Sequence, residues 1–224
     1  MSDFLKKIYP HLLCFVFIAL LSLAYFYPVL SNKSIEQSDI SQFRGMAEQV
    51  IDHRQTYDEE PYWLDNAFLG MPSYQVSAKY PYDLLSYVDQ TIRFLPRPAD
   101  YLFLYMLSFY ILIIGLNYNW RYALLGSIAF GFSTYMIIIL GVGHNTKALA
   151  IAYIPLVVAG LVLLRQNKLL PGFLVSLLGI SLQIRANHYQ MTYYMLILLG
   201  IYVIVYLIDS YRKKDLKEYL KLRH

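Results

Sequence analysis

The chain has 224 residues, of which 58% are hydrophobic and only 15% charged, and its formal net charge is +4. A soluble globular domain is closer to half apolar and a quarter charged, so this composition excludes an ordinary soluble domain and favours a membrane protein. The small net charge does not indicate nucleic acid as a partner, and the single cysteine, Cys14, excludes a disulfide within the chain.

Six apolar runs are long enough, or nearly so, to cross a bilayer core, which requires about 20 apolar residues per helix. The runs span residues 10–30, 101–116, 122–140, 148–164, 169–184 and 190–208. Backbone groups must be hydrogen-bonded within lipid, so each run is predicted to be a helix. The first run is too long and aromatic for a signal peptide and has no cleavage motif, so it is predicted to be retained. The predicted fold is therefore an all-α polytopic membrane protein with about six transmembrane helices.

The distribution of basic residues predicts the orientation of these helices. Residues 1–9 and the tail 209–224 are basic, and the positive-inside rule places both in the cytoplasm. The inner turns then contain Arg121, Arg165 and Lys168. The outer turns contain only Lys147 and Arg185. Residues 31–100 become a large periplasmic or extracellular loop domain, and residues 101–208 supply the five further transmembrane helices.

The outer segment, residues 31–100, is predicted to be folded. It carries 11 of the 15 acidic residues and is too long to be a simple connection. Its many aromatic side chains argue against disorder. The spacing of apolar residues predicts an amphipathic helix that starts at Ser38–Asp39 and passes through Ile51, and a second one over residues 81–95. A turn is expected at Gly70–Pro72.

Three polar clusters follow apolar runs on the predicted outer side of the membrane. They contain, in chain order, Glu36 and Asp39; His144, Asn145 and Lys147; and Arg185, Asn187, His188 and Gln190. Cations at this face can bind a phosphate through charge-assisted hydrogen bonds. For each cluster a structural role is the alternative: Lys147 can reach the lipid headgroups, and the two histidines can stabilise turns.

Asp39 is the strongest single candidate for a catalytic role. It lies close to the predicted membrane surface, where a carboxylate can act as a general base on an acceptor hydroxyl. It can also hold a divalent cation together with Glu36, which is one candidate for an otherwise unknown cofactor. The structural alternative is that Asp39 caps its helix.

Five motifs together resemble the YfhO-like membrane protein family, most closely its Bacteroidetes-type branch. The motifs occupy residues 37–46, 70–75, 95–99, 143–147 and 185–188, so the resemblance extends over essentially the whole chain. Members of that family are usually longer, with further spans and a C-terminal outer domain. The chain is therefore expected to be an N-terminal portion, which by itself can lack part of an active site.

The resemblance implies a GT-C-like inverting glycosyltransferase of the bacterial inner membrane, with a polyprenyl-phosphate-linked sugar as donor and a glycan or lipid as acceptor. It assigns the role of the essential acidic residue in the first outer loop to Asp39. By the same analogy Arg185, Lys147, His144 and His188 hold the donor phosphate or the acceptor. Glu36, Asn145, Asn187 and Gln190 belong to the same expected substrate-binding set. Membrane lipids are the other expected partners.

Two non-enzymatic hypotheses remain open from the sequence. A flippase or transporter for lipid-linked glycans would use the same cations, but it predicts ionisable groups near the bilayer midplane, where transport sites tend to lie. A membrane scaffold, whose outer segment binds a partner, predicts that the three polar clusters do not converge in space.

Overall fold

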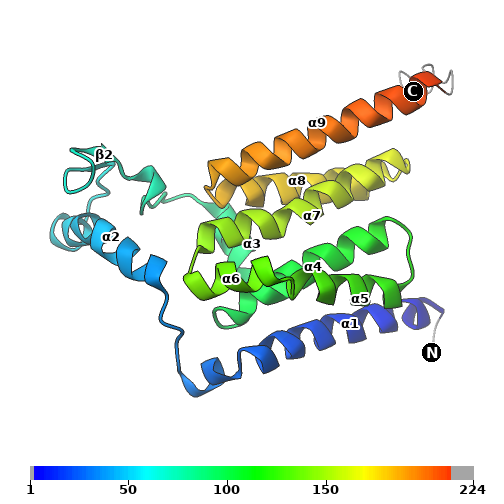
Figure 1. The fold of residues 1–224 in the computed structure, drawn as a ribbon, viewed down its shortest axis with the longest axis horizontal. Helices are drawn as coiled ribbons and strands as arrows, with labels where there is room; N and C mark the ends of the chain where they lie inside the picture. Colours follow the sequence, from blue (N-terminus) through cyan, green and yellow to red (C-terminus); the bar gives the residue numbers. More distant parts are fainter. Residues whose placement is uncertain (1–2, 213–224) are drawn as a thin grey trace. The chain divides into compact units, whose positions relative to one another are not determined.

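The computed structural model describes residues 3–212 and is drawn in Figure 1. The elements in chain order are α1 (Asp3–Tyr25), η1 (Tyr27–Ser31), α2 (Ser38–Tyr57), β1 (Trp63–Leu64), β2 (Met71–Pro72), η2 (Ser73–Gln75), α3 (Leu84–Ile92), α4 (Ala99–Gly115), α5 (Trp120–Gly131), α6 (Thr134–Val142), α7 (Asn145–Arg165), α8 (Leu169–Arg185) and α9 (Tyr189–Arg212). The first compact unit ends at Asn187, and the second begins at His188 and contains α9. Apart from the antiparallel pair β1–β2, the described regular structure is helical.

The chain is a membrane-embedded helical protein, as its composition predicts. By length and composition, α1 from Leu5, α7 and α9 can each cross a membrane. The pair α5 and α6, bent by 48° at a short break, can form a fourth crossing. Helices α4 and α8 are also apolar but have 17 residues each, so the full set of six spans stays a prediction. Large apolar side chains on α1 and α8 are exposed, which suits lipid and not water.

Several helix bounds differ from the predicted runs, and local sequence explains the differences. Helix α1 ends at Tyr25 and not near residue 30, because Pro28 cannot continue an α-helix and lies in the short 3-10 helix η1. The predicted third run is broken because Ser133, the N-cap residue of α6, has an extended backbone. Helix α3 is shorter than residues 81–95 because Asp83 caps it by accepting a hydrogen bond from the Ser86 amide.

Helix α4 lies at the centre of the first unit and is buried along its whole first half, from Ala99 to Met106. It packs against α1, α5 and α7, and α7 packs in turn against α8. A hydrogen bond of 2.7 Å between His11 Nδ1 and the Tyr110 hydroxyl joins α1 to α4. Within the first unit, α1, α4, α5 and α7 run side by side in Figure 1, and α2 and β2 lie at one end of them.

Glycines allow α7 and α8 to approach closely. A Cβ atom on Gly179 of α8 would lie 2.8 Å from the Val157 backbone nitrogen of α7, and one on Gly172 would lie 2.7 Å from the Leu164 nitrogen. Small residues are typical of membrane helix interfaces because they bring two backbones into van der Waals contact. The tight α7–α8 pair fixes where α8 ends, and its last residue, Arg185, is a candidate site residue.

Polar contacts link the parts of residues 31–100, the segment for which the sequence predicts a folded loop domain. Gln49 of α2 accepts hydrogen bonds from the amides of Asp65 and Asn66. Arg54 forms a two-pronged ion pair with Glu60, with both N–O distances at 2.6 Å, and also donates to the Ser77 carbonyl oxygen. The hydrogen bond from Arg54 lowers the pKa of Glu60 despite its partial burial. These contacts hold the β1–β2 region against α2 without a large apolar core.

The α7–α8 interface yields a test of the packing. We expect Gly179→Ala to lower the stability of the protein by about 1–3 kcal/mol, because the added methyl group forces two backbones apart. The matched control is Gly141→Ala in α6, where a Cβ atom would meet nothing within 4 Å. Melting temperatures in detergent measure both, and equal values for the two variants would contradict the close approach.

Candidate functional site

A cavity of about 480 Å³ opens where α3, the α3–α4 turn, the start of α7 and the end of α8 meet. Its charged lining comes from Asp89, Arg93, Arg97, Asp100 and Arg185. The remaining lining residues are Gln90, Leu95, Thr146, Leu149, Ala186 and Asn187. Three arginines against two aspartates leave one net positive charge, so the cavity suits an anion.

The carboxylate of Asp89 is the centre of this site. It is 2% exposed and accepts two hydrogen bonds from Arg93, of 3.1 and 2.5 Å. Arg185 donates a third, at 3.2 Å, and the Tyr153 hydroxyl of α7 donates a fourth. One buried carboxylate therefore links α3, α7 and α8. Such a group is stable only because every acceptor position has a donor.

The charges of this network shift the pKa values of its members in α3 and next to it. Burial alone would raise the pKa of Asp89, but the hydrogen bonds from Arg93 and Tyr153 and the charge of Arg185 outweigh it and lower that pKa. Burial alone would lower the pKa of Arg93, but the bond to Asp89 and the charge of Asp100 raise it above its usual value. Both groups are therefore ionised at neutral pH, and Asp89 is a poor proton acceptor.

Arg93 donates hydrogen bonds to two buried carboxylates, those of Asp89 and Asp100. Its Nη1 lies 2.5 Å from Asp100 Oδ2 at the start of α4, its side chain is 7% exposed, and its guanidinium lies 5.3 Å from the centre of the Tyr101 ring. Arg97 approaches the same ring at 5.6 Å but is exposed, and it forms no ion pair within residues 3–212. Pro96 and Pro98 flank Arg97 and restrict its backbone, so this cation is held at the cavity.

Arg185 connects the cavity to its rim. Its Nε donates to Asp83 Oδ2 at 2.8 Å, and its Nη1 donates to the buried Asp89. The side chains of Arg185 and Asp83 are 26% and 28% exposed, so this outer contact is open to solvent and to ligands. Asn187, two residues further on, donates to the Tyr74 carbonyl oxygen at 2.7 Å. The end of α8 is thus fastened to the outer segment.

Asp39 and His144 form a pair at the start of α7, where His144 is the N-cap residue. Asp39 Oδ2 lies 3.2 Å from His144 Nδ1, and both side chains are nearly half exposed. Gln37 donates to the Leu140 carbonyl oxygen at 2.6 Å, and Gly143 packs against Gln37 with a φ of 95°. The start of α2 is therefore docked on the turn between α6 and α7. The cap position of α2 is Gln37 and makes no side-chain cap hydrogen bond, so the predicted capping by Ser38–Asp39 is wrong.

The other predicted site residues have varied positions. Glu36 is exposed in the extended segment before α2, and Asn145 is the first residue of α7. Lys147 Nζ lies 5.6 Å from the centre of the Tyr135 ring and is not among the cavity lining. His188 and Gln190 belong to the second unit, where the His188 carbonyl oxygen accepts from Thr192 and Gln190 donates to the Tyr194 hydroxyl. Of the predicted set, Arg185 and Asn187 line the cavity, and Asp39 meets His144.

Sequence reasoning did not single out most of the charged cavity residues. Asp89 and Arg93 stand four residues apart on a predicted amphipathic helix, and this spacing is the typical signal of an ion pair on one helix face. Asp100, a carboxylate at the start of an apolar run, was a second signal. Tyr153 gave none, because a tyrosine within an apolar helix is usually part of the core.

No protein family, curated protein or solved structure matches this chain. The resemblance to YfhO-like proteins therefore remains an expectation drawn from the motifs. Within residues 3–212, no group of three or more His, Cys, Asp or Glu side chains is arranged to hold a metal ion.

The Asp89 network yields a test of stability and of its pH dependence. We expect Asp89→Asn to lower stability by about 3 kcal/mol, because Arg93 and Arg185 lose a buried countercharge. The pKa of Asp89 is lowered in the folded protein, so its contribution is full above the unfolded value of about 3.9. It is lost as the pH falls through the lower folded value.

Melting temperatures in detergent at several pH values measure this effect. The difference between wild type and Asp89→Asn should be constant from neutral pH to about pH 5 and should narrow below about pH 4. The matched control is Asp52→Asn, an exposed carboxylate on α2. A difference that grows on acidification would contradict the assignment.

Proposed function

We propose that the protein is a membrane glycosyltransferase with a GT-C-like reaction, in which a sugar moves from a polyprenyl phosphate to an acceptor hydroxyl at the outer membrane face. The observation that carries the proposal is the cationic cavity, lined by Thr146 near the start of α7, together with the carboxylate–imidazole pair at the start of the same helix. Thr146 lines the cavity, and His144 is only two residues away along the chain. A phosphate-binding element and a candidate base thus lie at the same end of α7.

The reaction divides between these two elements. The acceptor oxygen bonds to the anomeric carbon while the bond from that carbon to the phosphate oxygen breaks. The electron pair of the broken bond leaves with the polyprenyl phosphate, and the cavity arginines stabilise its charge. The acceptor proton passes to the Asp39 carboxylate. A direct displacement of this kind inverts the configuration at the anomeric carbon.

His144 is the positioning residue for Asp39. When its Nδ1 carries a proton, the imidazole donates to Asp39 Oδ2 and leaves Oδ1 to receive the acceptor proton. The buried Asp89 does not suit the role of base, because four donated hydrogen bonds occupy it. Asp39, by contrast, is open to an incoming hydroxyl group.

The proposed base is tested by transfer of labelled sugar from polyprenyl-phosphate donors in membranes that contain the protein. We expect Asp39→Asn to reduce the rate by at least about 100-fold, the usual contribution of a general base. The matched control Asp52→Asn removes an exposed carboxylate from the same helix and should keep full activity. Full activity of Asp39→Asn, in membranes where the wild type is active, would contradict the proposal.

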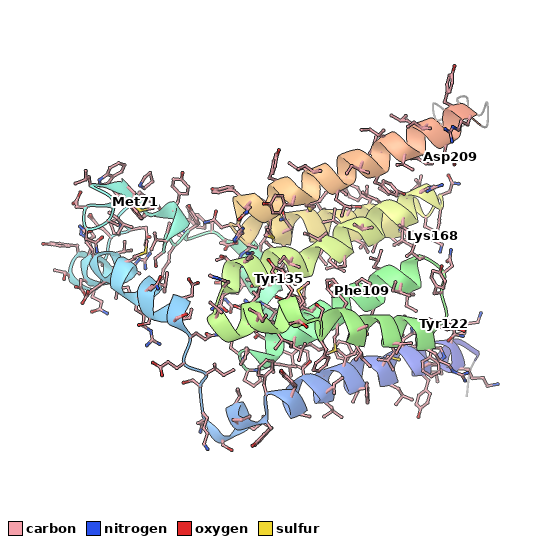
Figure 2. The ribbon with its side chains drawn as sticks, in the orientation of Figure 1. Met71, Phe109, Tyr122, Tyr135, Lys168 and Asp209 are labelled. Carbon is pink, nitrogen blue, oxygen red and sulfur yellow. The ribbon has the colours of Figure 1, made fainter. Side chains whose placement is uncertain are left out.

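We also propose that six helices cross the inner membrane of a bacterium, with the N-terminus in the cytoplasm. Two contacts support a common side for two basic turns: Gln166 donates to the Gly115 carbonyl oxygen at 2.8 Å, and Lys168 donates to Asn117 at 3.2 Å. Tyr122 and Lys168 lie at the same end of the helices in Figure 2, and α1 begins at that end in Figure 1. Met71 of the outer segment lies at the opposite end.

This orientation is tested with single cysteines in a Cys14→Ala background. Tyr82 in the outer segment and Tyr118 in the α4–α5 turn are both exposed. We expect a membrane-impermeant maleimide to label Tyr82→Cys in spheroplasts, and to label Tyr118→Cys only after the membrane is permeabilised. The reverse pattern would contradict the orientation and leave the helical fold unaffected.

A further inference from the structure

The three arginines that line the cavity differ in how their donors are used. Arg97 lies exposed between two prolines and over the Tyr101 ring, and among the described residues 3–212 it forms no ion pair. Arg185 divides its guanidinium between the buried Asp89 and the half-exposed Asp83. Arg93 donates three hydrogen bonds to the buried Asp89 and Asp100, and at 7% exposure its side chain is the least accessible of the three. Arg97 and Arg185 are therefore the cavity arginines most accessible to a ligand.

We propose that the cavity binds a phosphate monoester or diester group through Arg97 and Arg185, and that Asp83 is an internal competitor which the phosphate displaces from Arg185. The inference rests on the proposed function in so far as that reaction needs a phosphate site, and it deepens the proposal by naming that site. Asp89 acts as a positioning residue for Arg185, and the ion pairs of Arg93 with Asp89 and Asp100 hold that carboxylate in place.

The geometry of Asp83 suits competition. Its Oδ1 accepts from the Ser86 amide and caps α3, and only Oδ2 binds Arg185. The contact to Arg185 lies at the rim of the cavity, where solvent weakens an ion pair. A phosphate offers several oxygens to a planar guanidinium and forms two parallel hydrogen bonds, which a single carboxylate oxygen does not. Binding a phosphate in place of Asp83 Oδ2 is therefore favourable.

The two functions of Asp83 can be separated by one substitution. Asparagine is as good an N-cap residue as aspartate, so Asp83→Asn keeps α3 capped and removes the negative charge that competes for Arg185. If the Asp83–Arg185 ion pair is purely structural, Asp83→Asn should be less stable than wild type and should bind phosphate no more tightly. A competitor predicts tighter phosphate binding, a result that loss of structure does not produce.

The experiment is a ³¹P NMR titration of the full chain in detergent micelles with two probes, inorganic phosphate and farnesyl monophosphate. We expect Arg97→Ala to weaken binding about tenfold, the usual effect of losing a charge-assisted hydrogen bond. We expect Asp83→Asn to tighten binding about three- to tenfold, because removal of the competing carboxylate frees Arg185. Binding should weaken as salt is added.

The controls remove the same charges elsewhere in the chain. Arg121→Ala deletes another exposed arginine that lies over an aromatic ring, 5.2 Å from the centre of the Trp120 ring. Asp52→Asn deletes an exposed carboxylate of α2. Both should leave phosphate affinity within about twofold of wild type, since neither residue lines the cavity. Melting temperatures of all four variants should match wild type within the range usual for surface substitutions.

Unchanged affinity in Arg97→Ala, or unchanged or weaker affinity in Asp83→Asn, would overturn the inference. If farnesyl monophosphate binds and inorganic phosphate does not, the ligand is a lipid headgroup; equal binding identifies a free phosphate. No sugar transfer is needed for this measurement, so its failure is distinct from that of the proposed function. If the phosphate titration fails, sugar transfer can still depend on Asp39. If sugar transfer is absent, Arg97 and Arg185 can still bind phosphate.

Discussion

The buried carboxylate of Asp89 joins α3, in the segment 31–100, to the apolar helices α7 and α8. It accepts hydrogen bonds from Arg93 next to α3, Tyr153 in α7 and Arg185 at the end of α8. A charge with 2% exposure is stable only in the presence of such partners. Because each donor comes from a different element, the same requirement that stabilises the charge also sets the position of α3 over the bundle. The cavity is the space that this arrangement leaves between the arginines.

Packing within the bundle supplies the second constraint. Glycines at the α7–α8 interface bring the two backbones together, and the buried first half of α4 lies against α7. The hydrophobic effect contributes little to helix association within lipid. Close van der Waals packing and interhelical hydrogen bonds stabilise the association instead. The ends of α7 and α8 are therefore fixed relative to each other, and Thr146 and Arg185 can line one cavity.

The proposed reaction uses two groups of polar residues, one buried and one exposed. In the Asp89 network the buried carboxylate accepts four hydrogen bonds, and these hold Arg93 and Arg185 in place. The Asp39–His144 pair and Arg97 are exposed, so they remain available to ligands. Rigid support behind accessible polar groups is the usual construction of a binding site. The buried residues support the site, and the exposed residues are the ones proposed to contact a substrate.

The sequence by itself determined the class of the protein, because apolar runs and amphipathic spacing are local properties. It predicted the helical membrane character, the helix from Ser38 and the polar turns at His144 and Arg185. It did not predict the partner of Arg185 or the role of Asp89, since residues about a hundred positions apart meet only through tertiary packing. The break before Thr134 likewise depended on the backbone at Ser133, within a run that reads as continuously apolar. Only the folded chain decided which charges pair and which remain free, because that depends on distance in space.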